Sequence, residues 1–187
     1  MVNESEAILA CRQWVEEVVV GLNLCPFAAQ PMGQGRVRFH ATPADQLETI
    51  YQSFLQELDQ INRLDEAEVE TALFIIPRGL EQFSDYLELL TLAEEVIAEA
   101  GLEGLFQLAS FHPDYRFEGA TADDPANYTN RSPYPMIHVI REAPLSRALE
   151  SYPNPEQIPQ RNVQLLRDMG IERVQAQLAH CLVGEED

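Results

Sequence analysis

The residues best suited to chemistry lie in one long loop, between positions 111 and 134. His112 follows a predicted strand directly, and α/β sheets place working residues at such strand ends. The same loop carries Tyr115, Asn130 and Arg131, whose side chains form directional hydrogen bonds. A loop this long is usually functional or disordered, and its aromatic content argues against disorder. We therefore predict a site here, with His112 as an acid or base and the other three as ligand-binding residues.

A second feature of the loop is an arginine that precedes two prolines. Arg131 is followed by Pro133 and Pro135, which limit the freedom of the chain around it. A guanidinium held in this way binds a carboxylate or phosphate through two parallel hydrogen bonds. Arg116, Arg141 and the strand face that carries Arg36 and Arg38 are the candidates to converge on the same anion. The alternative is that each arginine pairs with one of the 31 carboxylates of its own protein.

Cys25 is a candidate nucleophile because Pro26 follows it at the end of the first predicted helix. If Pro26 begins another helical turn, backbone N–H groups lower the pKa of the thiol. Cys25 would then be the catalytic nucleophile and His112 its base. The alternative is a buried, inert thiol, which the flanking Leu24 and Phe27 favour.

The remaining candidates are assigned to the core. Cys11 and Cys181 fall on apolar helix faces, and His138 lies between two β-branched residues of a predicted strand, where we expect one hydrogen bond. Trp14 is predicted to be a core residue or the wall of a pocket.

Metal and cofactor sites are not predicted. His112 and Asp114 have the spacing of an iron-binding facial triad, but His138 lies too near and His180 falls on a terminal helix. No C-x-x-C pair is present to hold structural zinc. All 12 basic residues are arginine, and the absence of lysine excludes a Schiff base, a pyridoxal-phosphate anchor and a Walker-type phosphate loop.

Charge excludes one class of partner. The 187 residues carry a formal net charge of −19, so nucleic acid is repelled, and the excess is concentrated in residues 42–100. The acidic start does not resemble a secretory signal, and no stretch reaches the length of a membrane span. We expect a cytoplasmic protein with reduced thiols and no membrane partner. The oligomeric state is not predicted.

Hydrophobic periodicity predicts strands that alternate with long helices. The fold class expected is α/β: a single-domain sandwich over residues 1–187, with a mixed sheet of about four strands, crossover helices and a helical C-terminal tail. The order of the strands and the direction of the fourth are not determined. The expected helices are 5–21, 42–64, 80–100, 144–151, 159–169 and 171–182, and the expected strands are 36–41, 71–76, 104–111 and 135–141.

Three segments carry a family resemblance. They are NLCPFA at 23–28, ASFHPDY at 109–115 and NRSPYP at 130–135. With them the chain resembles, over essentially its whole length, a bacterial family of unknown function, number fourteen-fifteen of the domain-of-unknown-function series. The resemblance implies a single-domain cytoplasmic protein without an established activity, and it supplies no catalytic residue.

Two classes of function follow from the sequence. The first is a small cytoplasmic enzyme or small-molecule binder that recognises an anionic ligand on the 111–134 loop. The second is a non-catalytic acidic protein whose helix faces in 42–100 meet a basic partner. The cluster of polar and aromatic side chains on the loop favours the first.

Overall fold

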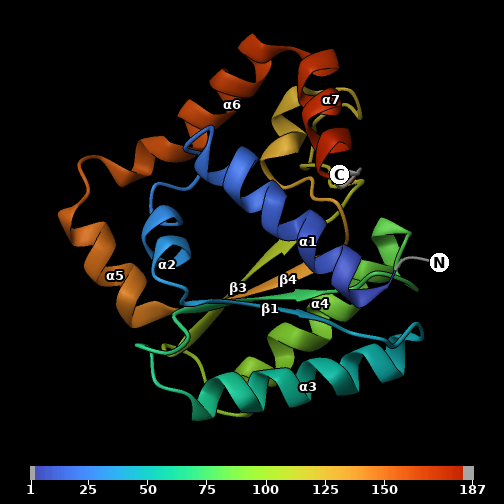
Figure 1. Cartoon of the computed structure of the whole chain (residues 1–187), viewed down its shortest axis with the longest axis vertical. Coiled ribbons are helices and arrows are strands. Elements are labelled where there is room, and N and C mark those ends of the chain that lie inside the picture. The colour runs from blue at the N-terminus through green and yellow to red at the C-terminus, as the bar shows by residue number, and fades with distance from the viewer. Residues whose placement is uncertain (1–2, 183–187) are drawn as a thin grey trace.

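Strands and helices alternate along the chain and build one open sheet with helices on both faces (Figure 1). The computed structural model describes residues 3–182. The strands are β1 (Val37–Ala41), β2 (Thr71–Ile75), β3 (Phe106–Phe111) and β4 (Met136–Arg141). The helices are α1 (Glu4–Trp14), α2 (Ala29–Gly33), α3 (Leu47–Arg63), α4 (Phe83–Glu99), α5 (Glu142–Ser151), α6 (Ile158–Met169) and α7 (Ile171–Leu182). This arrangement confirms the predicted α/β class with a mixed sheet and a helical C-terminal end.

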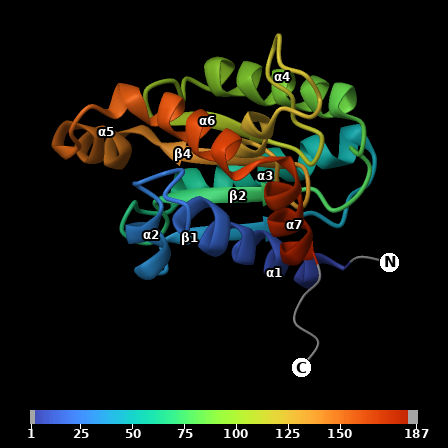
Figure 2. The same ribbon diagram turned by 90° about the horizontal axis from the view of Figure 1, so that it is seen from above.

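The strand order is β1-β2-β4-β3, and the last strand of the chain lies inside the sheet. β1 and β2 are parallel, whereas β4 runs antiparallel to both of its neighbours (Figure 2). The carboxyl ends of β1, β2 and β3 therefore meet at one edge of the sheet, and their amino ends meet at the other. The long loop leaves from the carboxyl edge, and α5 follows β4 directly at the amino edge.

Both faces of the sheet are buried, which explains why β2 is apolar at every position after Thr71. On one face, Phe74, Ile137 and Val139 pack against α3 and α4. On the opposite face, Leu73, Ile75 and Met136 pack against α1, α6 and α7. Among residues 3–182 no helix has the length and apolar character needed to cross a membrane.

The first helix differs from the prediction of one uninterrupted helix over 5–21. A capping box between Asn3 and Glu6 starts α1, and α1 ends at Trp14. A π-helix over Val15–Val20 follows, and the hydrogen bond from the Gly21 N–H to the Glu16 carbonyl, 3.0 Å long, closes its wider turn. Such turns are frequent at functional sites, and this one borders the cavity described below.

The long loop is ordered around a buried asparagine. The Asn127 side chain accepts a hydrogen bond from the Phe117 N–H at 3.1 Å and donates one to the Thr121 carbonyl at 2.9 Å. Asn127 lies in a short 3-10 helix, Pro125–Thr129, that packs against α6. The loop therefore folds back over the helical layer.

Candidate functional site

His112 is fully buried, and both of its ring nitrogens have partners within the protein. Nε2 donates to the Leu80 carbonyl at 3.0 Å, and Nδ1 accepts from the Asp114 N–H at 3.0 Å. The rings of Phe83 and Tyr86 lie within 5.3 Å of it. Burial lowers the pKa of His112, so the imidazole is neutral at pH 7. In this arrangement His112 fixes the start of the loop.

Of the other residues predicted for the loop site, Tyr115 packs its ring against those of Phe83 and Phe117 at 5.3 and 5.0 Å. The side chains of Asn130 and Arg131 bind backbone carbonyls. The Asn130 carbonyl accepts from the His112 N–H at 3.1 Å, and its side chain donates to the Ser110 carbonyl at 2.9 Å. Arg131 donates from Nε to the Tyr115 carbonyl at 3.1 Å and from Nη2 to the Ala122 carbonyl at 3.0 Å. These contacts give the cluster a role in ordering the loop.

The two remaining arginines of the predicted site lie apart from each other. Arg116 is exposed, and within residues 3–182 its side chain forms no ion pair. Arg141, at the end of β4, donates to the carbonyls of Val69, Ile61 and Leu64 at 2.8, 2.6 and 2.7 Å. Two of these carbonyls, Ile61 and Leu64, lie at the C-terminal end of α3, where Ile61 also accepts from the Leu64 N–H, so Arg141 caps this helix end.

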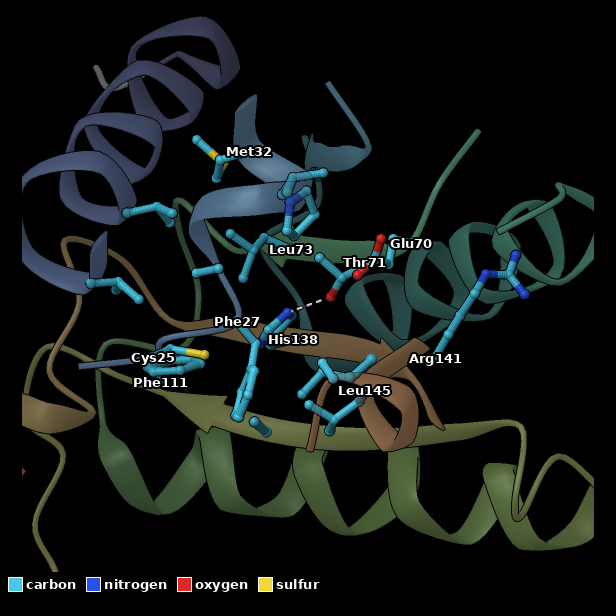
Figure 3. Close-up of a pocket in the computed structure, with 18 of the residues that line it drawn as sticks. Cys25, Phe27, Met32, Glu70, Thr71, Leu73, Phe111, His138, Arg141 and Leu145 are labelled. Atoms are coloured by element: carbon cyan, nitrogen blue, oxygen red, sulfur yellow. Dashed lines mark hydrogen bonds between the residues drawn. The ribbon is translucent and has the colours of Figure 1, made fainter. Parts of the chain in front are cut away.

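The structure has a cavity of about 250 Å³ between the sheet and the N-terminal helical segment, and Arg141 lies at its border (Figure 3). Its floor is the sheet face that carries Leu73, Ala109 and His138. Its roof is apolar and comes from α1, the π-helix, the 25–28 turn, α2 and α5. The roof residues are Trp14, Val15, Val19, Phe27, Ala28, Pro31, Met32, Leu145 and Ala148.

Small side chains leave the space for this cavity. Ala109 and Leu73 flank His138 in the register of β3, β4 and β2, so all three lie on the same sheet face. The methyl group of Ala109 does not fill the volume beneath the helices, and Ala28 and Ala148 leave room in the roof. A cavity lined in this way gives up packing contacts that a filled core would make, unless a ligand supplies them.

His138 is the polar group on the floor of the cavity. Its Nε2 lies 2.5 Å from the Thr71 hydroxyl, shown as a dashed line in Figure 3. Burial among apolar groups lowers the pKa of His138 to about 4, so the ring is neutral at pH 7. The expectation of a histidine packed inside with one hydrogen bond is confirmed, and the ring also borders a cavity.

Cys25 borders the same cavity from the turn after the π-helix. Burial raises the pKa of the Cys25 thiol above its ordinary 9.0, although the N–H groups of Phe27 and Ala28 act in the opposite direction. The predicted turn after Cys25 is present, since the Ala28 N–H donates to the Cys25 carbonyl at 3.2 Å. The N–H groups of this turn lower the pKa of the thiol by less than burial raises it.

Iodoacetamide is expected to modify Cys25 before Cys11 and Cys181, because those two thiols are fully buried and Cys25 is not. The reaction of Cys25 at pH 7.5 should nevertheless be slower than that of free cysteine, because little thiolate is present. Mass spectrometry of peptides from briefly labelled, folded protein measures both rates. Labelling of Cys25 faster than free cysteine would show an activated thiol.

Charged groups at the cavity are already paired. Glu70 forms an ion pair with Arg36 at 3.0 Å, and the Arg141 guanidinium points away from the cavity (Figure 3). Within residues 3–182, no three His, Cys, Asp or Glu side chains gather closely enough to hold a metal ion. The site is therefore apolar, with His138, Thr71 and Cys25 as its uncharged polar groups.

Fold and site together define an open-sheet α/β protein with an apolar cavity on one face of the sheet. The chain matches the family described as "Protein of unknown function (DUF1415)" over residues 6–176, and it belongs to that family. No curated protein matches it. A search of solved structures also gives no match.

Proposed function

We propose that the protein binds a small, uncharged and mainly apolar molecule in the cavity between the sheet and α1. The observation that supports this proposal is the volume of the cavity. An engineered apolar cavity of about 150 Å³ holds benzene, and this cavity of about 250 Å³ is larger. A substituted ring or a two-ring molecule matches that size. Most of its surface would contact aliphatic and aromatic side chains, as is usual for small-molecule sites.

An uncharged ligand is favoured because the cavity offers no free counter-charge. Arg141 donates to three carbonyls, and Glu70 is paired with Arg36. Burying an unpaired charge in an apolar site costs several kcal/mol or more. The net charge of −19 further disfavours anions at long range. The anion site expected on the loop is a weaker hypothesis, because Arg131 already donates to two carbonyls.

Binding is favoured over nucleophilic catalysis by the energetics of proton transfer. The pKa of Cys25 lies above 9.0 and that of His138 is about 4. Moving a proton from the thiol to the imidazole is therefore unfavourable by at least about 7 kcal/mol, at 1.36 kcal/mol per pKa unit. His112, the base predicted for Cys25, already has partners at both ring nitrogens.

Filling the cavity should abolish binding without unfolding the protein. Ala109→Leu adds three carbon atoms to the floor, where the space for them exists. Phenol, indole and 4-bromophenol are expected to raise the melting temperature of the wild type with the concentration dependence of mass action. The same compounds should not change the melting temperature of Ala109→Leu. They should raise that of Ala98→Leu, on the exposed side of α4, as they do for the wild type. Equal shifts in all three proteins, or none in the wild type, would contradict the proposal.

A further inference from the structure

The direction of one hydrogen bond fixes the proton on His138. The Thr71 hydroxyl donates its single proton to the Val139 carbonyl at 3.0 Å. A hydroxyl that donates to this carbonyl accepts at His138, whose Nε2 lies 2.5 Å away. This arrangement places the hydrogen of the neutral ring on Nε2 and a lone pair on Nδ1.

That lone pair has no partner within the protein. Among residues 3–182, the hydrogen bond of the His138 ring is the one between Nε2 and Thr71, and Nδ1 forms none. Nδ1 is also not completely buried. Within residues 3–182, the completely buried side-chain nitrogen or oxygen atom that lacks a partner is Nε of Arg36, so Nδ1 retains some accessible surface. The ring lines the cavity, and Nε2 is the nitrogen that faces Thr71 (Figure 3), which leaves Nδ1 to a ligand in the cavity.

The described residues next to His138 on the sheet are apolar. The neighbours of His138 across the sheet are Leu73 and Ala109, and the ring of Phe111 lies 6.2 Å away. Phe111 in turn contacts Trp14 edge to face at 5.3 Å. An acceptor in such surroundings gains a hydrogen bond when a ligand brings a donor, and it disfavours a ligand that lacks one.

We propose that the ligand carries one hydroxyl or N–H group on an otherwise apolar ring or chain, and that this group donates a hydrogen bond to Nδ1 of His138. This inference rests on the proposed function, since it describes the ligand of the same cavity. It names His138 as the residue that selects the ligand and Thr71 as the residue that positions it by fixing the tautomer. The ligand class is that of phenols, uncharged alcohols and indole-like N–H compounds.

The test compares two probes of similar shape that differ in the donor. 4-Bromophenol has a hydroxyl where 4-bromotoluene has a methyl group, and bromine quenches tryptophan fluorescence on contact. Trp14 is the only tryptophan of the chain and lines the cavity, so its fluorescence reports occupancy. At pH 7 the wild type should bind 4-bromophenol about fivefold more tightly than 4-bromotoluene, which is the net contribution of one hydrogen bond to affinity.

His138→Phe keeps a ring on the floor but removes the acceptor, so the preference should reverse toward 4-bromotoluene. His180→Phe, at an exposed position of α7, is the matched control and should keep the preference of the wild type. The ¹⁵N chemical shifts of His138 in the wild type give a readout that needs no variant. They should show hydrogen on Nε2, a bare Nδ1, and a change at Nδ1 when 4-bromophenol binds.

The outcomes separate the two proposals. If both probes quench Trp14 in a saturable way but with equal affinity, the cavity binds apolar molecules and the role of Nδ1 is refuted. A hydrogen on Nδ1 in the ¹⁵N spectrum refutes it as well. If neither probe gives saturable quenching, the proposed function itself fails.

Discussion

Replacing Arg141 with methionine is expected to lower the free energy of unfolding by about 3 kcal/mol, because charge-assisted hydrogen bonds of this kind contribute about 1.5–3 kcal/mol. Three carbonyls, those of Ile61, Leu64 and Val69, lose the hydrogen bond from Arg141, and Ile61 keeps the one from the Leu64 N–H. Methionine keeps apolar contact with Phe106, over whose ring the guanidinium lies at 5.1 Å. The decrease in the free energy of unfolding therefore measures mainly the lost hydrogen bonds and only to a small extent lost packing.

Urea denaturation of the variant measures this effect, and Arg147→Met is its matched control. Arg147 also carries an ion pair, with Glu66 at 2.6 Å, but both side chains are exposed, so its loss should be small. Arg141→Lys should retain part of the stability. If Arg141→Met is as stable as the control, the capping role assigned to Arg141 is wrong, and its predicted role in ligand binding regains support.

Acidification should cost the protein about 3 kcal/mol of stability through His138 alone, at 1.36 kcal/mol per pKa unit. The pKa of His138 is about 4 in the folded protein, against 6.5 for an ordinary histidine. Above pH 6.5 the ring is neutral in both the folded and the unfolded state, so the contribution is complete. Between pH 6.5 and pH 4 the unfolded state binds the proton first, and stability falls as the pH falls.

The measurement is the free energy of unfolding at pH 7 and pH 4.5 for the wild type and His138→Phe. Burial also lowers the pKa of His112, so the variant should keep a part of the pH dependence. The difference between the two proteins isolates His138, and His180→Phe should follow the wild type. Parallel pH profiles for wild type and His138→Phe would show that His138 is well solvated, and the cavity would then be polar.

The helices and strands could be predicted closely because their periodicity follows burial on one or both faces. Strand β2 was expected at 71–76 and lies at Thr71–Ile75, and the last helix was expected at 171–182 and lies at Ile171–Leu182. The position of β4 between β2 and β3 depends on pairing between segments far apart in sequence, which no local pattern specifies. The π-helix also lacks a pattern of its own, since its valines fit an α-helix equally well.

The site was harder to predict because a cavity arises where side chains are too small to fill the space. The polar and aromatic residues of the 111–134 loop predict a site there, but His112 and Arg131 bind backbone groups of the protein itself. The sequence does contain a signal for the cavity. It is His138 at the centre of an apolar strand, together with a single Ala109 on a neighbouring strand, but only the register of the sheet brings them together.

Anomalous scattering from crystals soaked in 4-bromophenol tests the central claim most directly, because bromine locates the ligand without reference to the fold. A bromine peak is expected inside the cavity between Trp14 and His138, with the hydroxyl within hydrogen-bond distance of Nδ1. Bromine peaks on the protein surface alone, with the space above Ala109 filled by side chains, would contradict it.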